Sequence, residues 1–197
     1  FAKEMPADPE AIRAWLPRNR RAEVKKALRI DEPNENSFRK TSIIGEFYNV
    51  YAPALRNLGT PVMPRKFLAA LAANFGEDVD IGLVEHQGKP VAGLFSFWFR
   101  DRIMPYYIGA DRKARDIRAY DYLYYTLMRR AVERGVRVFD FGRSKVGSTP
   151  LQNHKTSFCA SSRLPRRSAS SSLIANVASA QLMIPLSALA SRAPSRR

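Results

Sequence analysis

Residues 79–108 have the sequence VDIGLVEHQGKPVAGLFSFWFRDRIMPYYI, and the architecture of the chain is best worked out from this stretch. Apolar residues alternate at its start, and the pair Gln87-Gly88 supplies a hairpin turn. A nearly continuous apolar run follows at 91–99, and Asp101-Arg102 then turns the chain into a third run at 103–108. The stretch therefore predicts an antiparallel three-strand meander whose middle strand is covered on both faces.

Helical patterns flank this meander. Before it, helices are predicted over 8–16, 18–29, 37–58 and 64–75. After it, a three-to-four-residue apolar spacing predicts a long helix over 116–134, which Gly135 ends, and then a short buried strand at 136–141. The predicted fold class is α/β, with a mixed sheet flanked by helices.

The chain is strongly positive, and its charge is unevenly distributed. The formal net charge is +15 and the isoelectric point is near 10.4, which favours a polyanionic partner such as nucleic acid, nucleotide phosphate or an anionic membrane face. All acidic residues lie at or before Asp140, so residues 141–197 add only positive charge. The cationic segment at 18–29 has two open interpretations, a solvated helix face or a contact with phosphate or nucleic acid.

Several classes of function lack the residues that they need. The one cysteine, Cys159, excludes an internal disulfide and agrees with a reducing compartment, so we expect a cytoplasmic protein. Two histidines and one cysteine make no convincing metal site and no nucleophile with a histidine base, so no metal is expected. The triplet Asp140-Phe141-Gly142 occurs without the glycine loop, strand lysine and catalytic loop of a kinase.

Residues 159–197 differ in composition from the rest of the chain. They hold ten Ser, eight Ala and six Arg, and they contain no acidic, aromatic or glycine residue. Their best apolar run, 173–190, is interrupted by polar residues and a proline, so no stable membrane span is expected. This composition predicts disorder.

Five further segments occur in a characteristic order. They are LPRNRRAEVKK at 16–26, FYNVYA at 47–52 with RNLGTPV at 56–62, PYY at 105–107 with Gly109, AYDYLYY at 119–125, and FDFGRSK at 139–145 after Arg134-Gly135. Together they resemble the FemAB-like proteins, in particular the subgroup associated with exosortase and exopolysaccharide systems in bacteria. Each segment alone would be weakly specific, whereas their common order over residues 1 to about 147 makes the resemblance specific.

The resemblance implies a fold, a domain organisation and an activity. FemAB-like enzymes are similar to two GNAT acyltransferase domains in tandem, and they transfer an amino acid from aminoacyl-tRNA to an amine of a peptidoglycan precursor. The matching segments belong to the second domain. We therefore expect a helical lead-in at 1–37 from the end of a first domain, a GNAT-like acyltransferase domain at 38–158, and a disordered or out-of-frame tail at 159–197. The donor would be aminoacyl-tRNA or another acyl donor, and the acceptor an amine of an envelope precursor or saccharide.

The resemblance weakens after Lys145. The family continues with a glycine-rich segment, an aromatic-lysine pair and a WGF segment before a strand that ends the sheet, whereas this chain has VGSTPLQNHKTSF at 146–158. We therefore expect a sheet that is incomplete at the C-terminus, so that the strand at 137–141 has an unpaired edge. We also expect a piece that is inactive by itself. A reading-frame shift beginning within about 148–158 would explain the change, and a natural divergent tail is the alternative.

Two residues are predicted to act in catalysis and five to bind substrate. Lys155 resembles the family's lysine and would stabilise a tetrahedral oxyanion, while Asp121 would orient or deprotonate the attacking amine. The predicted substrate-binding residues are Tyr106, Tyr107, Arg112, Arg143 and Ser144. Structural alternatives remain open for several of them, namely a surface or helix-turn carboxylate for Asp121, packing for the two tyrosines, and an ion pair with Asp140 for Arg143.

The segment 109–116 bears on the donor. An ordinary acetyl-CoA enzyme has a glycine cluster here that binds pyrophosphate, whereas this segment has one glycine and several cations. The cations could hold a phosphate or form a solvated basic turn. We expect no acetyl-CoA bound in the usual way and no other cofactor.

Two other functions remain open at this point. The chain could be a non-catalytic GNAT-like module that binds a saccharide or a protein partner. It could also be a basic nucleic-acid-binding protein, whose binding would fall steeply with salt.

Overall fold

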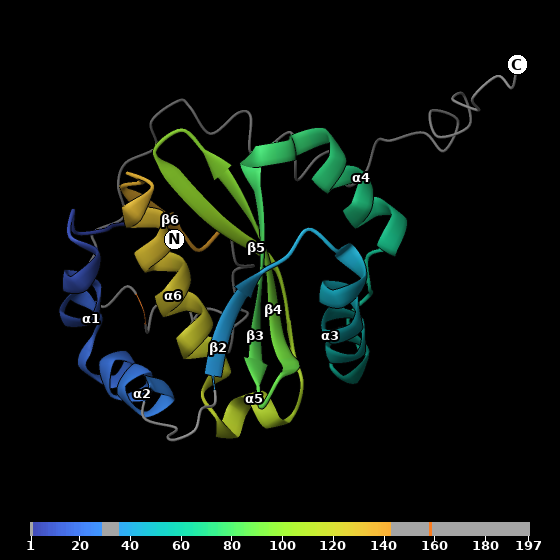
Figure 1. The fold of residues 1–197 in the computed structure, drawn as a ribbon, viewed down its shortest axis with the longest axis horizontal. Helices are drawn as coiled ribbons and strands as arrows, with labels where there is room; N and C mark the ends of the chain where they lie inside the picture. The colour runs from blue at the N-terminus through green and yellow to red at the C-terminus, as the bar shows by residue number, and fades with distance from the viewer. Residues whose placement is uncertain (1, 29–35, 143–157, 159–197) are drawn as a thin grey trace, which may run out of the picture. The chain divides into compact units, whose positions relative to one another are not determined.

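The computed structural model describes residues 2–28, 36–142 and 158. Six strands form one sheet in the order β1-β6-β5-β4-β3-β2, and helices cover both of its faces (Figure 1). The strands are β1 Ala2–Glu4, β2 Asn36–Lys40, β3 Val79–His86, β4 Lys89–Phe99, β5 Arg102–Ala110 and β6 Val138–Asp140. The helices are α1 Ile12–Trp15, α2 Arg18–Leu28, α3 Ile44–Asn57, α4 Arg65–Phe75, α5 Lys113–Asp116 and α6 Ala119–Glu133, with 3-10 turns η1 Pro9–Ala11 and η2 Gly76–Asp78.

The predicted meander is confirmed. β3 pairs antiparallel with β4, and β4 pairs antiparallel with β5. The middle strand β4 is buried at every position from Val91 to Trp98. Its unbroken apolar sequence follows from this burial, because alternate side chains enter the cores on opposite faces of the sheet.

The sheet separates two apolar cores. On one face α6 packs over sheet residues such as Leu94, and α1 and α2 pack against α6. On the other face α3, through residues such as Phe47, packs over Phe95 of the sheet, and α4 packs against α3. A side chain on α6 and a side chain on α3 therefore serve opposite faces of the sheet, which determines which predicted site residues can meet.

The predicted helix over 37–58 is wrong in its first third. Residues 36–40 form β2, which pairs antiparallel with β3, and the helix begins only at Ile44. Phe38 fits a strand because its ring lies over Gly82, where an added Cβ would come within 2.5 Å of it. Thr41 marks the true boundary, because its hydroxyl accepts the N–H of Ile43 at 3.0 Å and donates to the Glu46 carboxylate.

The predicted strand after the long helix is confirmed, and it lies beside the meander. β6 pairs parallel with β5 through two positions, Arg102 with Val138 and Ile103 with Phe139. The expectation that its other edge stays unpaired is wrong. β1, in the segment expected to be a helical lead-in, pairs antiparallel with β6 and covers that edge. β1 was not predicted because a strand of three residues is too short to show an alternating apolar pattern in the sequence.

One close approach fixes α3 on the sheet. α3 crosses β5 at Gly109, where an added Cβ would lie 2.4 Å from the Cα of Tyr51 and 3.2 Å from the carbonyl oxygen of Val50. The backbone of the helix thus rests on the strand where the strand has no side chain. This contact places the C-terminal half of α3 next to the turn that follows β5.

Candidate functional site

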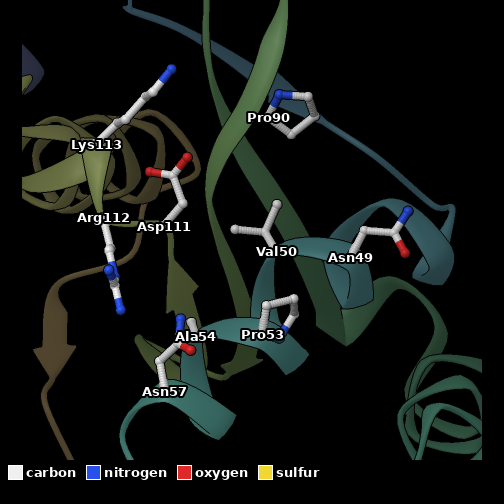
Figure 2. A pocket seen from close by; sticks show the side chains of 9 residues that line it. All are labelled: Asn49, Val50, Pro53, Ala54, Asn57, Pro90, Asp111, Arg112 and Lys113. Carbon is white, nitrogen blue, oxygen red and sulfur yellow. The ribbon is translucent and has the colours of Figure 1, made fainter.

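A groove lies at the end of the sheet where β4 begins and β5 ends. Its volume is about 440 Å³, which suits a small molecule or one group of a larger ligand. α3 supplies one wall, and the turn between β5 and α5 supplies the other (Figure 2). The lining residues are Asn49, Val50, Pro53, Ala54, Asn57, Pro90, Asp111, Arg112 and Lys113.

The turn wall is held by backbone and carboxylate hydrogen bonds. The N–H of Asp111 donates to the carbonyl of Val91 at 2.9 Å, which ties the turn to β4. The Asp111 carboxylate accepts the N–H of Ala114 at 2.9 Å and so caps the start of α5. Arg112 and Lys113 are exposed, and Figure 2 shows them leaving the turn in opposite directions. This wall therefore presents two cations on an anchored backbone.

The α3 wall combines an apolar surface with amide groups. Val50, Pro53 and Ala54 give the apolar surface, and Asn49 and Asn57 stand beside it. Pro53 has no N–H, so the carbonyl oxygen of Asn49 receives no helical hydrogen bond from that position. Opposite the two cations, the groove thus offers acceptors for an amine or hydroxyl group of a ligand.

A packing contact explains why residue 109 is glycine, without any role in binding phosphate. The missing side chain of Gly109 is required by the contact with Tyr51, and the residue is buried within β5. α5 begins four residues later and has four residues. The prediction that 109–116 lacks an acetyl-CoA pyrophosphate nest is not tested by this geometry and stays a prediction.

The shared ladder of β5 and β6 is short. Among the described residues, the two strands pair at Arg102 and Ile103 of β5. A register shift between Phe95 and Ser96 on β4 also leaves Tyr106 of β5 without an opposite residue.

Asp121 lies on the opposite face of the sheet from the α3 wall, in a network between α2 and α6. Its side chain is 9% exposed, and its carboxylate accepts a hydrogen bond from the Arg20 guanidinium at 3.0 Å. The Arg20 guanidinium also lies over the ring of Phe158, at 4.7 Å. Nearby, Glu23 pairs with Lys26 at 2.8 Å and with Arg118 at 2.5 Å.

The two carboxylates of this network have pKa values shifted in opposite directions. Burial raises the pKa of Asp121 above its usual range, and the hydrogen bond from Arg20 opposes this rise. The hydrogen bond from Lys26 lowers the pKa of Glu23, with the charge of Arg118 acting in the same direction. A buried carboxyl with a raised pKa is suited to hold a proton, although ion-pair networks that only support the fold show the same shift.

We expect Glu23→Gln and Asp121→Asn to change the pH dependence of stability with opposite signs. The folded pKa of Glu23 is lowered, so its contribution is present above about 4.5 and is lost as pH falls through the folded pKa. The folded pKa of Asp121 is raised, so the folded state binds the extra proton and stability declines as pH rises from about 3.8 through the folded pKa. Relative to the wild type, Glu23→Gln should become less stable with rising pH and Asp121→Asn more stable. Urea unfolding over a pH series measures both slopes, and slopes of equal sign would contradict this assignment.

The structure brings few of the predicted site residues together. Arg112 lines the groove. Tyr107 is buried and makes edge contacts with Tyr51 and Phe95, while the half-buried Tyr106 contacts Phe97. Both tyrosines thus pack in the α3-side core, and neither lines the groove. The predicted residues Arg143, Ser144 and Lys155 lie outside the described residues.

Sequence reasoning missed two parts of this region. The α3 wall was not predicted, although FYNVYA at 47–52 belongs to one of the family-like segments and Pro53 inside a helical pattern marks an unusual position. Arg20 was also missed as the partner of Asp121, because 101 positions separate the two residues and no local pattern relates them.

Comparisons with known proteins agree with the fold. Residues 7–155 match the family model described as the acetyltransferase (GNAT) domain. A search of curated proteins finds no match to the chain. FemX superimposes with a TM-score of 0.68 at 12% identity, over 80% of this chain and 57% of FemX. A conserved protein of unknown function from Bacteroides thetaiotaomicron gives 0.59 at 17% identity, over 80% and 57% of the two chains.

A third solved structure has a similar fold. The C-terminal domain (DUF2156) of a putative lysylphosphatidylglycerol synthetase from Agrobacterium fabrum gives a TM-score of 0.52 at 13% identity, over 79% of this chain and 53% of that chain. This chain thus spans little more than half the length of these proteins, and at such identities the likeness concerns the fold. The family match extends over most of the sequence, and the chain belongs to the acetyltransferase (GNAT) domain family.

Proposed function

We propose that the protein is a FemAB-like acyltransferase that moves an aminoacyl or other acyl group to an amine, in the cytoplasm. The observation that carries the proposal is the match of residues 7–155 to the acetyltransferase (GNAT) domain. The likeness in fold to FemX and the ordered segments of the sequence support the FemAB-like form. On the same resemblance, the acceptor would be an amine of a cell-envelope precursor or of a saccharide in an exosortase-associated exopolysaccharide system.

The proposed reaction needs positioning more than activation. The lone pair of the amine attacks the ester carbonyl of the donor, a C–N bond forms, and the C–O bond to the ribose breaks. The proton lost by the amine passes to the leaving ribose oxygen. Arg112 would hold a donor phosphate, and Lys155 would stabilise the oxyanion. Asp121 does not line the groove, so its predicted role, to orient the amine or take its proton, would require the amine to bind on the α6 side of the sheet.

A donor-binding experiment tests the proposal on the chain as it stands. We expect tight binding of an aminoacyl-tRNA and no tight binding of acetyl-CoA, both measured by calorimetry. Arg112→Ala should weaken donor binding by about tenfold, since a charge-assisted hydrogen bond contributes roughly 1.5–3 kcal/mol and this one is exposed. Lys66→Ala, an exposed cation on α4 that does not line the groove, is the matched control. Tight acetyl-CoA binding would overturn the proposed donor.

A turnover experiment tests the chemical step. This piece by itself is expected to be inactive, so transfer is measured in a protein that also contains the rest of the FemAB-like fold. There, transfer from aminoacyl-tRNA to a small amine should be lost in Lys155→Ala with donor binding retained, because the lysine acts on the transition state. Donor binding without any transfer, in a protein that extends beyond these residues, would count against an enzyme.

A non-catalytic binding module is the second candidate. It is favoured by the groove itself, in which the one carboxylate among the described lining residues, Asp111, already caps α5. Such a module would bind an anionic saccharide through Arg112 and Lys113 without binding aminoacyl-tRNA. The donor-binding experiment separates the two candidates.

A further inference from the structure

The positive charge of the fold is concentrated at one end. Residues 18–28 and 111–118, which we call the basic surface, hold nine Lys and Arg against three carboxylates. The remaining described residues hold fourteen Lys and Arg against twelve carboxylates, so they are nearly balanced. The excess charge of the described fold is therefore a local feature, and a local feature of this kind indicates a local partner.

α2 presents its cations on its outer side. Val24 and Ala27 are buried, whereas Arg18, Arg21 and Lys25, at i, i+3 and i+7, lie along an exposed stripe. Arg21 also donates to the carbonyls of Ala14 and Leu16 at the end of α1. Packing of the apolar side on α6 thus fixes the stripe outward, because the helix cannot rotate without exposing its buried residues.

Hydrogen bonds and one ion pair join the two segments of the basic surface. Glu23 of α2 pairs with Arg118, and Asn36 donates to the carbonyls of Ala27 and Ile117 at 3.2 and 3.0 Å. Figure 1 shows α2, α5 and the C-terminal end of α3 at the same end of the sheet. Among the described residues, neither Lys25 nor Arg115 has an ion-pair partner, and both are exposed.

Two protruding leucines lie at the margins of these cations. Leu28 ends α2 and is 44% exposed. Leu58 follows the groove residue Asn57 and is 75% exposed, which is the largest exposure of a large apolar side chain among the described residues. Exposed aliphatic side chains are costly in water and would gain from contact with an apolar phase.

We propose that this end of the protein docks on an anionic phospholipid bilayer. Basic residues near an anionic leaflet are attracted to its headgroups, and the two leucines would enter the boundary between headgroups and acyl chains. Contact would be peripheral, since no described helix is long and apolar enough to cross a membrane. An RNA other than the proposed donor fits less well, because the basic surface contains no aromatic residue on which a base could stack. The groove would then open next to the membrane surface.

Vesicle co-sedimentation of the full chain tests the proposal. We compare vesicles of phosphatidylcholine alone with vesicles of equal parts phosphatidylcholine and phosphatidylglycerol, at low and high salt. Binding should require phosphatidylglycerol and weaken with salt. Lys25→Ala/Arg115→Ala should weaken it about 25-fold, because each basic residue near the surface strengthens partitioning roughly fivefold.

Two further variants keep the test specific. Lys66→Ala/Arg137→Ala removes the same charge from exposed positions outside the basic surface and should bind as the wild type does. Both double variants retain every cation of residues 143–197. Equal losses of vesicle binding in the two variants would therefore mean that the basic surface is not the docking site, and would overturn the proposal. Leu28→Ser/Leu58→Ser should weaken vesicle binding on the order of tenfold.

A transfer-RNA binding assay on the same variants separates the two polyanions. The leucine variant should bind RNA as the wild type does, because RNA offers no apolar phase. Loss of RNA binding in Lys25→Ala/Arg115→Ala with vesicle binding unchanged would identify a nucleic-acid surface and overturn the proposal. Vesicle binding that is insensitive to both leucines would overturn it as well. None of these measurements depends on acyl transfer.

Discussion

Gly109→Ala is expected to destabilise the protein by roughly 3 kcal/mol or more. An added Cβ would lie 2.4 Å from the Cα of Tyr51, and a backbone atom cannot move aside as a side chain can. Either α3 lifts off β5 or β5 bends, and both movements disturb the core around Phe47 and Phe95. For a chain of this size the midpoint of thermal unfolding should fall by roughly 6–12 °C.

Gly45→Ala is the matched control for this prediction. Gly45 lies in the first turn of α3, and an added Cβ there would meet the guanidinium of Arg65, which is the flexible end of a side chain. Alanine is favoured over glycine in a helix by about 1 kcal/mol, so we expect little loss or a small gain in stability. A Gly109→Ala protein as stable as wild type would contradict the close approach of α3 and β5.

Gly109→Ala is also expected to affect ligand binding. α3 forms one wall of the groove and β5 leads into the other, so a shift at Gly109 changes the distance between Val50 and the Asp111 turn. Binding of the donor should therefore fall in Gly109→Ala even at temperatures where the variant remains folded. Circular dichroism and calorimetry on one sample distinguish this effect from unfolding.

The sheet was largely predictable because its central strands have patterns that only one structure satisfies. Residues 91–99 are apolar on both sides, and a strand between two cores is the simplest explanation of such a run. β2 was not predictable because Phe38 fits both a helical and a strand spacing. Its environment depends on Gly82, which lies more than forty positions away in the sequence.

The site was less predictable than the fold for a related reason. Arg112 was found because its neighbours in the sequence are also cations, whereas the α3 wall reaches the groove only through the contact at Gly109. Tyr106 and Tyr107 illustrate the opposite case. A tyrosine pair suggests a binding surface, but the two rings contact each other at 4.8 Å between centroids and pack with the α3-side core.

Arg20→Ala is expected to cost about 2–3 kcal/mol at neutral pH. Removing one partner of a buried ion pair leaves the other charge uncompensated, and the full cost is typically 3–5 kcal/mol. Here the Arg20 side chain is 21% exposed and Arg118 is also near Asp121, so we place the cost at or below the lower end. The stacking of Arg20 on Phe158 is lost as well. Urea unfolding at neutral pH measures the loss.

The pH dependence of this loss identifies its origin. Without Arg20, burial raises the pKa of Asp121 unopposed by the hydrogen bond, so the folded state holds a proton that the unfolded state releases. Stability then falls as pH rises through the window between the unfolded and folded pKa values, and the deficit of Arg20→Ala should shrink as pH is lowered toward 4. The double variant Arg20→Ala/Asp121→Asn should recover most of the loss at neutral pH, because it buries no charge. A deficit that is independent of pH and unchanged in the double variant would mean that the ion pair does not stabilise the fold, and that Arg20 acts through its contact with Phe158 instead.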